Sequence, residues 1–285
     1  MHPREAFTRN CFKAAPCLIA LAVYLSGCNP DGISGLGNLY SSSSSSSSSD
    51  TASAAGIWTG VDSATGLQMT GFVDSSGQAD FILSNGIQFT GAVQVAGTSV
   101  AMSLDGYPQF GAQFSDGSTY GVGTFNGTVS SGSSITGTLS FTTTGNSMST
   151  SNWSLTFNSL YDMSSPVSAV SGTYTDGGSA VSQGLDPLSG ATVSISSIGA
   201  ISGQSPTTGC ALNGTISTSN ASYDVYQVSY TYENCTGAYS VLNGVQLTGL
   251  ADFNPNESPS GIVIGVAGVS GSGTRYGAVL ALSGS

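Results

Sequence analysis

Apolar and polar residues alternate in short runs over most of the chain from residue 56 to residue 285. Successive side chains of a β-strand point to opposite faces of a sheet, so a period of two predicts strands with one buried face. The alternation is clearest in the segments 87–95, 135–141, 225–232 and 245–253. Long stretches with the helical period of 3.6 residues are missing from this part of the sequence. The pattern predicts an all-β protein.

Glycines indicate which kind of sheet these strands form. Asn-Gly and Asp-Gly pairs supply the positive φ angles of two-residue hairpin turns, and such pairs begin at residues 85, 105, 116, 126 and 213. Gly71, Gly91, Gly137 and Gly249 each follow a threonine inside a predicted strand. A glycine there suits a sheet that bends or takes a close neighbour, which favours barrels over flat sandwiches. The expected fold is two antiparallel β-barrel or barrel-like sandwich domains.

Two similar openings divide the β-rich part into halves. GIWTG begins at residue 56 and GTYTD begins at residue 172, and both place an aromatic residue and a threonine after the glycine. A segment containing Pro166 separates the halves. We therefore expect a first β domain over residues 56–165 and a second over residues 166–285, each of about 110 residues and sufficient for one core.

The first 27 residues have a different pattern. Arg4, Arg9 and Lys13 come first, and an apolar stretch over roughly residues 14–25 follows them. This stretch is shorter than the roughly 20 apolar residues that a membrane-spanning helix needs. The order of a basic start and a short apolar run predicts a cleaved export signal over residues 1–27.

The export signal ends in Leu25, Ser26, Gly27 and Cys28, and these four residues resemble the lipobox of bacterial lipoproteins. In that family the cysteine carries a diacylglycerol on its sulfur and becomes the acylated amino terminus after cleavage. The resemblance implies lipidation at Cys28, with enough acyl chains for stable membrane anchoring. Asn29 stands where an aspartate retains enteric lipoproteins in the inner membrane, so the resemblance implies a Gram-negative outer membrane, on either face. An ordinary secretory signal with an incidental cysteine is the alternative.

Residues 28–55 connect this cysteine to the first β domain. They include an unbroken serine run from Ser41 to Ser49 and nothing apolar enough to pack. Serine-rich tracts behave as flexible coil, with a mean span on the order of 30 Å for this length. We expect a tether that holds the folded part away from the membrane.

Removal of the export signal leaves a strongly acidic chain. The signal contains the single histidine, three of the four basic residues and one of the fifteen acidic residues, so Arg275 and fourteen acidic residues remain, with a formal net charge of −13. Nucleic acid is excluded as a partner, because its binding relies on Lys and Arg contacts to phosphates. Charged partners are expected to be cationic, unless the acidity serves only to keep an exported protein soluble.

Cys210 and Cys235 are the two cysteines after residue 28. An even pair in an exported, oxidising compartment predicts a disulfide. On the chain-entropy model a loop of this length contributes roughly 3 to 4 kcal/mol. A metal site is disfavoured, because two thiolates need further ligands and no histidine remains.

Catalytic side chains are sparse in the predicted mature chain. Nucleophilic triads commonly need histidine, phosphate loops need lysine, and neither residue type occurs after Lys13. Carboxylate pairs of the kind used by glycosidases remain, with Asp224, Glu233, Asp252 and Glu257 as candidates, but no spacing marks a pair. We therefore predict a non-enzymatic protein without a cofactor or a bound metal.

Gly56, Ile57 and Trp58 resemble the Gly-x-Trp opening of the calycin barrels, in which the tryptophan closes the barrel bottom. They are also similar to the barrel domains of Gram-negative surface lipoproteins such as transferrin-binding protein B. The resemblance implies barrel architecture. The lipocalin pattern also has an arginine over the tryptophan, but the first half has no arginine and Arg275 is expected to serve only the second half. Trp58 as a plain core aromatic is the alternative.

Tyr226, Tyr230 and Tyr232 fall on one side of a predicted strand close to Cys235. If exposed, they form a recognition surface for a protein or a sugar, because aromatic residues bring contact area at low entropic cost. The alternative is that they line the sheet core with their hydroxyls at its rim. These three tyrosines are the candidate binding surface.

These features predict a lipid-anchored envelope protein with a binding or structural role. A module that binds a protein or glycan ligand, an inert surface component, and a carbohydrate-binding or carbohydrate-active module are the three alternatives. A deep apolar barrel mouth favours the first alternative, and tightly filled barrels with no concavity favour the second. Exposed aromatics beside two close carboxylates favour the third.

Overall fold

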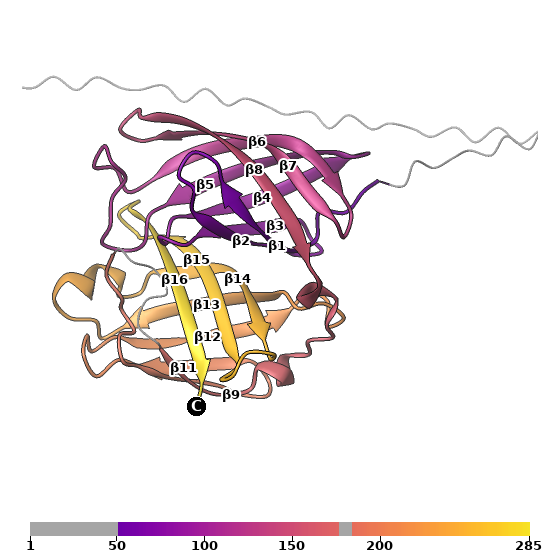
Figure 1. Cartoon of the computed structure of the whole chain (residues 1–285). Helices are drawn as coiled ribbons and strands as arrows, with labels where there is room; N and C mark the ends of the chain where they lie inside the picture. The colour runs from indigo at the N-terminus through magenta and orange to yellow at the C-terminus, as the bar shows by residue number, and fades with distance from the viewer. Residues whose placement is uncertain (1–50, 177–183) are drawn as a thin grey trace, which may run out of the picture. The chain divides into compact units, whose positions relative to one another are not determined.

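Strands β1 to β8 form a closed antiparallel barrel in the computed structural model, which describes residues 51–176 and 184–285. Each strand pairs with the next, and β1 pairs with β8 to close the barrel (Figure 1). The strands are β1 (Gly56–Asp62), β2 (Gln68–Val73), β3 (Gln78–Leu83), β4 (Gln88–Ala96), β5 (Ser99–Tyr107), β6 (Gly121–Ser130), β7 (Ser134–Thr143) and β8 (Met148–Asn158).

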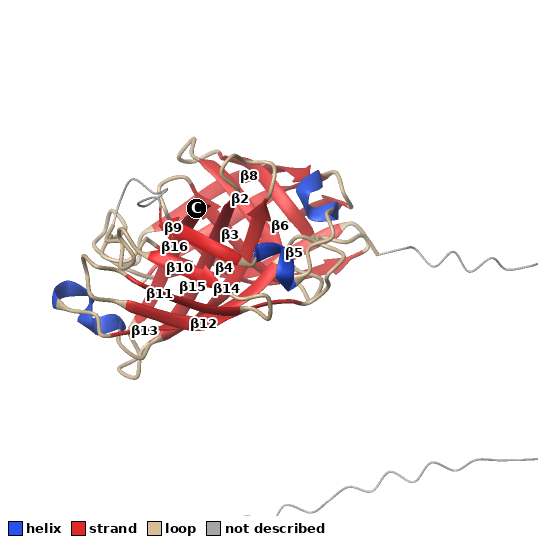
Figure 2. Ribbon diagram, turned by 90° about the horizontal axis from the view of Figure 1, so that it is seen from below, coloured by secondary structure: helices blue, strands red, loops and turns tan. Residues whose placement is uncertain are grey.

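Strands β9 to β16 form a second closed barrel with the same up-and-down order. Its closing seam between β9 and β16 runs from Asp176 opposite Leu282 to Tyr174 opposite Gly284. The prediction of an all-β protein with two antiparallel barrels is confirmed (Figure 2). The strands are β9 (Gly172–Asp176), β10 (Thr192–Ile195), β11 (Ala200–Gln204), β12 (Ala211–Thr218), β13 (Tyr226–Glu233), β14 (Gln246–Asn254), β15 (Gly261–Val269) and β16 (Arg275–Gly284).

Short 3-10 helices occur in the connections. Helices η1 (Ser159–Asp162) and η2 (Val167–Val170) link β8 to β9, and η3 (Gly237–Leu242) follows β13. The predicted opening GIWTG is the first part of strand β1, and GTYTD is the whole of strand β9.

Aromatic side chains fill the interior of the first barrel. Phe81, Phe89 and Phe125 surround Trp153, with ring centroids 5.1, 5.6 and 5.3 Å from its ring. The indole Nε1 of Trp153 donates to Asp62 Oδ1 at 3.1 Å. The alternating apolar residues of the predicted runs 87–95 and 135–141 pack into this core or against it, as their period of two predicts.

The chain begins to pack before residue 56. Ala54 is buried in the first core, and its carbonyl oxygen accepts a 3.0 Å hydrogen bond from Trp58 Nε1. The amide of Ala52 donates to Gly97 O at 2.9 Å. The sequence assigns residues 52–55 to the linker, but their backbone groups and small side chains are bound to the barrel.

Only some of the predicted hairpin turns are turns. Gly86 and Gly117 lie in turns with φ angles of 87° and 83°. The pairs that begin at residues 105, 126 and 213 lie inside strands β5, β6 and β12, so their prediction as turns is wrong. Glycine at these positions serves strand packing, because its missing side chain leaves room for a neighbouring strand.

The β5–β6 loop, residues 108–120, belongs to the first barrel and contacts the second. Both barrels belong to one compact unit of the chain. Its Gln109 side chain acts as a strand partner for β16: Val279 N donates to Gln109 Oε1 at 2.9 Å, and Gln109 Nε2 donates to Val279 O at 3.4 Å. The next residue, Phe110, packs into the core of the second barrel. The loop thereby satisfies backbone groups of β16 that lie outside the short seam with β9.

Candidate functional site

The predicted lipidation site lies outside the described residues. This applies to Cys28, to Leu25, Ser26 and Gly27 before it, to the whole export signal, and to the linker up to residue 50. Within the described ranges, no helix is long and apolar enough to cross a membrane.

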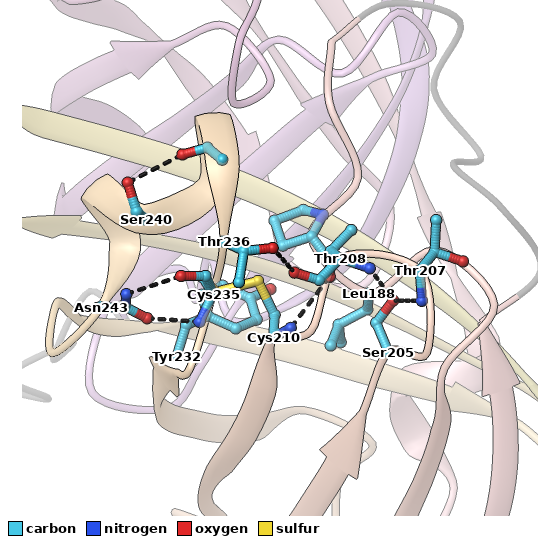
Figure 3. Close-up of a disulfide and its surroundings, with 12 residues drawn as sticks. Leu188, Ser205, Thr207, Thr208, Cys210, Tyr232, Cys235, Thr236, Ser240 and Asn243 are labelled. Atoms are coloured by element: carbon cyan, nitrogen blue, oxygen red, sulfur yellow. Dashed lines mark hydrogen bonds between the residues drawn. A yellow bond between two sulfur atoms is a disulfide. The ribbon is translucent and has the colours of Figure 1, made fainter.

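The predicted disulfide between Cys210 and Cys235 is confirmed. It joins Cys210, directly before β12, to Cys235, just after the end of β13, and both cysteines are buried in the second core. Asn243 holds Cys235 from both sides, accepting from its amide at 2.8 Å and donating to its carbonyl oxygen at 3.0 Å (Figure 3). These contacts give the disulfide a structural role, in which it fastens the ends of two neighbouring strands.

The tyrosines proposed as a binding surface are inside the second barrel. Tyr226, Tyr230 and Tyr232 are 0%, 2% and 0% exposed. Their period of two is the one that the sequence shows, but it turns them toward the core, where the hydroxyls of Tyr230 and Tyr232 lie 3.3 Å apart. The prediction of a binding surface is therefore wrong, because large aromatic rings fill the barrel interior and leave nothing for a partner to contact.

The four candidate carboxylates do not form one site. Asp224, Asp252 and Glu257 gather at one end of the second barrel, whereas Glu233 lies at the other end of β13, next to the disulfide. Burial raises the pKa of Asp252 to about 7, with contributions from the charges of Asp224 and Glu257. Burial likewise raises the pKa of Asp224 to about 6. The two aspartates interact, but at 0% and 8% exposure they are closed to a polymeric substrate.

Arg275, at the start of β16, is fixed by three side chains of the first barrel. Its Nη1 lies 3.2 Å from Asp105 Oδ2, and its guanidinium carbon lies 4.3 Å from the centroid of the Tyr120 ring. A hydrogen bond to Tyr107 raises the pKa of Arg275. The expectation that Arg275 serves only the second half is wrong, since all three partners belong to strand β5 or to the loop after it.

Tyr120 completes this arrangement. Its hydroxyl donates to Asp105 Oδ1 at 2.6 Å, and burial together with this hydrogen bond raises its pKa to about 12. Asp105 thus receives hydrogen bonds from Arg275 and Tyr120 on different oxygens. A guanidinium held by a carboxylate and an aromatic face is pre-organised, and the Arg275 side chain still has 39% of its surface exposed.

A surface pocket of about 210 Å³ lies beside Arg275. Phe110 and Tyr276 contribute aromatic rings with centroids 5.9 Å apart, and Gln113 and Thr119 contribute polar groups. This volume is below the ~300 Å³ at which sites for drug-sized ligands begin, so the pocket suits a single ring or side chain. Its walls offer stacking and hydrogen bonding but no carboxylate, thiol or imidazole, so the arrangement is suited to binding and not to acid–base chemistry.

The residues of this pocket could not be found from the sequence. Arg275 and Asp105 are 170 residues apart, and no motif connects them. The one available signal was that Arg275 is the only basic residue after Lys13. No protein-family model matches the chain, and a search of curated proteins found no similar sequence.

Proposed function

We propose that the chain is a lipoprotein of a Gram-negative cell envelope, anchored at the outer membrane through acyl chains on Cys28. Its two barrels serve a non-enzymatic role in binding or in the structure of the envelope. The observation that carries this proposal is the basic start and short apolar run that end in Leu25-Ser26-Gly27-Cys28. The serine run after Cys28 supports it, because a tether is what a barrel held at a membrane surface requires.

The filled barrels favour a role for their outer surfaces. The first barrel is occupied by Trp153 and the phenylalanines around it, and the second by the tyrosines of β13. Neither arrangement is that of a barrel with a deep apolar mouth, so contacts to a partner are expected on the outside. The pocket beside Arg275 is the surface feature that combines aromatic, amide and guanidinium groups.

Replacement of Cys28 by serine is expected to abolish lipid incorporation. The hydroxyl does not accept the diacylglycerol that the lipobox cysteine receives, so the chain should incorporate no radiolabelled palmitate. The matched control is Cys17→Ser, which removes another cysteine of the export signal and should keep the label. Palmitate on the Cys28→Ser chain, or normal processing in the presence of globomycin, would refute the anchor.

Carbohydrate binding is the second candidate function, and the lining of the pocket favours it. A sugar ring stacks on an aromatic face, here that of Tyr276, while amide and guanidinium groups donate to its hydroxyls. A carbohydrate-active role additionally requires two carboxylates at the substrate. Asp224 and Asp252 do not line this pocket, so binding without hydrolysis is the form that we favour.

A glycan array with the Cys28→Ser chain tests this second candidate. Gln113→Ala and Thr119→Ala each remove an exposed polar group from the pocket, and each is expected to weaken a bound glycan about 5- to 10-fold, the worth of about one hydrogen bond. Gln94→Ala, at a different hollow on β4, is the control and should change nothing. Equal binding by all variants would remove the pocket from consideration, and an array without any bound glycan would count against the carbohydrate function.

A further inference from the structure

The two barrels meet through an apolar contact. Strands β2 and β3 of the first barrel face β14 and β15 of the second, with β16 beside them. The side chains that form the contact belong to neither barrel core, and they come from strands and from the connections between them. They are Ile57, Phe72, Ile82, Tyr161, Val225, Leu250 and Val279.

One carboxyl group lies inside this contact without a partner. Asp80, in the middle of β3, is 1% exposed, and neither of its carboxylate oxygens has a hydrogen-bond partner in the part of the chain that the structure describes. It faces Gly265 of β15, where an added Cβ would collide with the Asp80 carboxylate. Gly265 pairs with Leu250 and with Val279, both of which belong to the apolar contact. The glycine therefore leaves the space in the second barrel that the carboxyl group of the first barrel occupies.

Within residues 51–176 and 184–285, no opposite charge compensates Asp80. Strands β2, β4 and β15 carry no charged residue, and β3 carries no other. The Asp252 carboxyl on β14 is influenced by Asp224 and Glu257, and Arg275 on β16 is paired with Asp105. An ionised carboxylate without a partner is costly to bury, so the group is held as the neutral acid. Burial accordingly raises the pKa of Asp80 well above its ordinary value.

We propose that Asp80 is a proton-dependent latch between the two barrels, closed while its carboxyl group is protonated and released when the group ionises. The ionised group regains its hydration only if β3 and β15 separate. Each barrel is closed by its own strand pairs, so separation of β3 from β15 breaks no strand pair within either barrel. Separation also exposes Phe72, Leu250 and the other contact residues, and so presents a new apolar surface.

The latch has a defined pH dependence. In the open state Asp80 is hydrated and ionises near pH 4. The closed state holds the proton to a higher pH, so the equilibrium constant for opening rises about tenfold per pH unit above that value. The rise ends at the pKa of the closed state. Below about pH 4 opening does not depend on pH.

The test is the reactivity of a thiol buried in the contact. Val225→Cys places one there with little change in volume, in a full-length chain whose Cys11, Cys17 and Cys28 are replaced by serine. The rate at which a thiol-specific reagent labels this cysteine is measured at each pH. It is divided by the rate for a free cysteine peptide at the same pH, which removes the effect of thiol ionisation. We expect the corrected rate to rise about tenfold per pH unit above pH 4. Asp80→Asn, which has no proton to lose, should remove the share of this slope that Asp80 contributes and leave only that of the neighbouring Asp224.

Asp74 provides the matched control. It is a second buried aspartate at this contact, but its carboxylate accepts hydrogen bonds from Gln227 Nε2 at 2.9 Å and from the amide of Ser76 at 2.8 Å. Asp74→Asn should accelerate labelling at every pH and leave the slope unchanged. An unchanged slope in Asp80→Asn, or no slope in the parent chain, would overturn the latch.

A cross-link separates opening of the contact from unfolding. The hydroxyls of Ser75 and Ser219 lie 3.3 Å apart across the contact, so a disulfide between cysteines at these positions ties the barrels together. We expect the Ser75→Cys, Ser219→Cys pair, oxidised before labelling, to slow the reaction of the Val225→Cys thiol at least tenfold above pH 7. Labelling that remains as fast in the cross-linked chain comes from opening within one barrel and contradicts the proposal.

Discussion

Replacement of Trp153 by alanine is expected to lower the free energy of unfolding of the first barrel by about 3–5 kcal/mol. Trp153 is 1% exposed and has Phe81, Phe89 and Phe125 around it, so truncation leaves a cavity that these rings cannot collapse to fill. It also removes one of the donors to Asp62, which is itself buried. Both losses destabilise the barrel interior, because three phenylalanine rings pack directly against Trp153.

Trp58 allows the loss of stability caused by Trp153→Ala to be measured in the first barrel alone. It is the other of the two tryptophans, lies in β1, and remains as a fluorescent probe of the first barrel in a Trp153→Ala chain. Denaturant unfolding followed by its emission gives the free energy. Trp153→Phe keeps a ring but loses the Nε1 donor, and should cost less than half as much. A loss below 1 kcal/mol in Trp153→Ala would show that the core repacks around the missing indole.

The barrel cores were predictable because they depend on a local pattern. In β13 the period of two places Tyr226, Tyr230 and Tyr232 on one face, and the structure has all three on one face. The sequence does not say which face of a strand is inside, since an exposed tyrosine ridge and a tyrosine-lined core have the same spacing. The choice is made by the other strands of the barrel, which lie elsewhere between Gly172 and Gly284 in the chain.

The roles of the glycines also could not be told from the sequence alone. Gly71 was expected to take a close neighbour, and its missing Cβ is where the Phe81 ring lies. At Gly106 the pair Asp-Gly predicts a turn, but the Phe141 ring occupies the space and the strand continues. A glycine required by φ and a glycine required by a neighbour read alike in the sequence. The two roles of glycine are distinguished only by the residue that lies opposite on the partner strand, and the pairing register of the two strands decides which residue that is.

The contact between the barrels carries no local pattern at all. Asp80 and Gly265, or Gln109 and Val279, meet because two closed barrels present particular outward faces to each other. From the sequence, a charged residue on the outward face of a strand is expected to be exposed to solvent. Asp80 would therefore be predicted to be an ordinary surface charge, although the structure buries it. The pocket beside Arg275 is hidden from sequence reasoning for the same reason.

The second barrel is expected to lose stability as the pH rises from about 4 to about 7. Asp252 is 8% exposed, and burial, with the charges of Asp224 and Glu257, raises its pKa from 3.8 to about 7. In the unfolded chain the group ionises near pH 4, so the folded state holds the proton more tightly over this interval. Its contribution to the free energy of unfolding is therefore full below pH 4, is lost as the pH rises to 7, and is constant above. A rise in pKa from 3.8 to about 7 corresponds to a loss of roughly 4 kcal/mol in the free energy of unfolding.

Asp252→Asn isolates this contribution, because the amide has nearly the same shape and no proton to lose. The free energy of unfolding is measured from pH 4 to pH 9 by circular dichroism, and tryptophan fluorescence identifies the part of the transition that belongs to the first barrel. The variant should overtake the parent chain near pH 6 and exceed it at pH 8, while Glu233→Gln, which changes an exposed carboxylate at the opposite end of β13, should follow the parent curve. Parallel curves for Asp252→Asn and the parent chain would mean that Asp252 is ionised in the folded protein. In that case the backbone hydrogen bonds of Asp252 and Val263, which lower the pKa of this carboxyl group, outweigh its burial and the charges of Asp224 and Glu257.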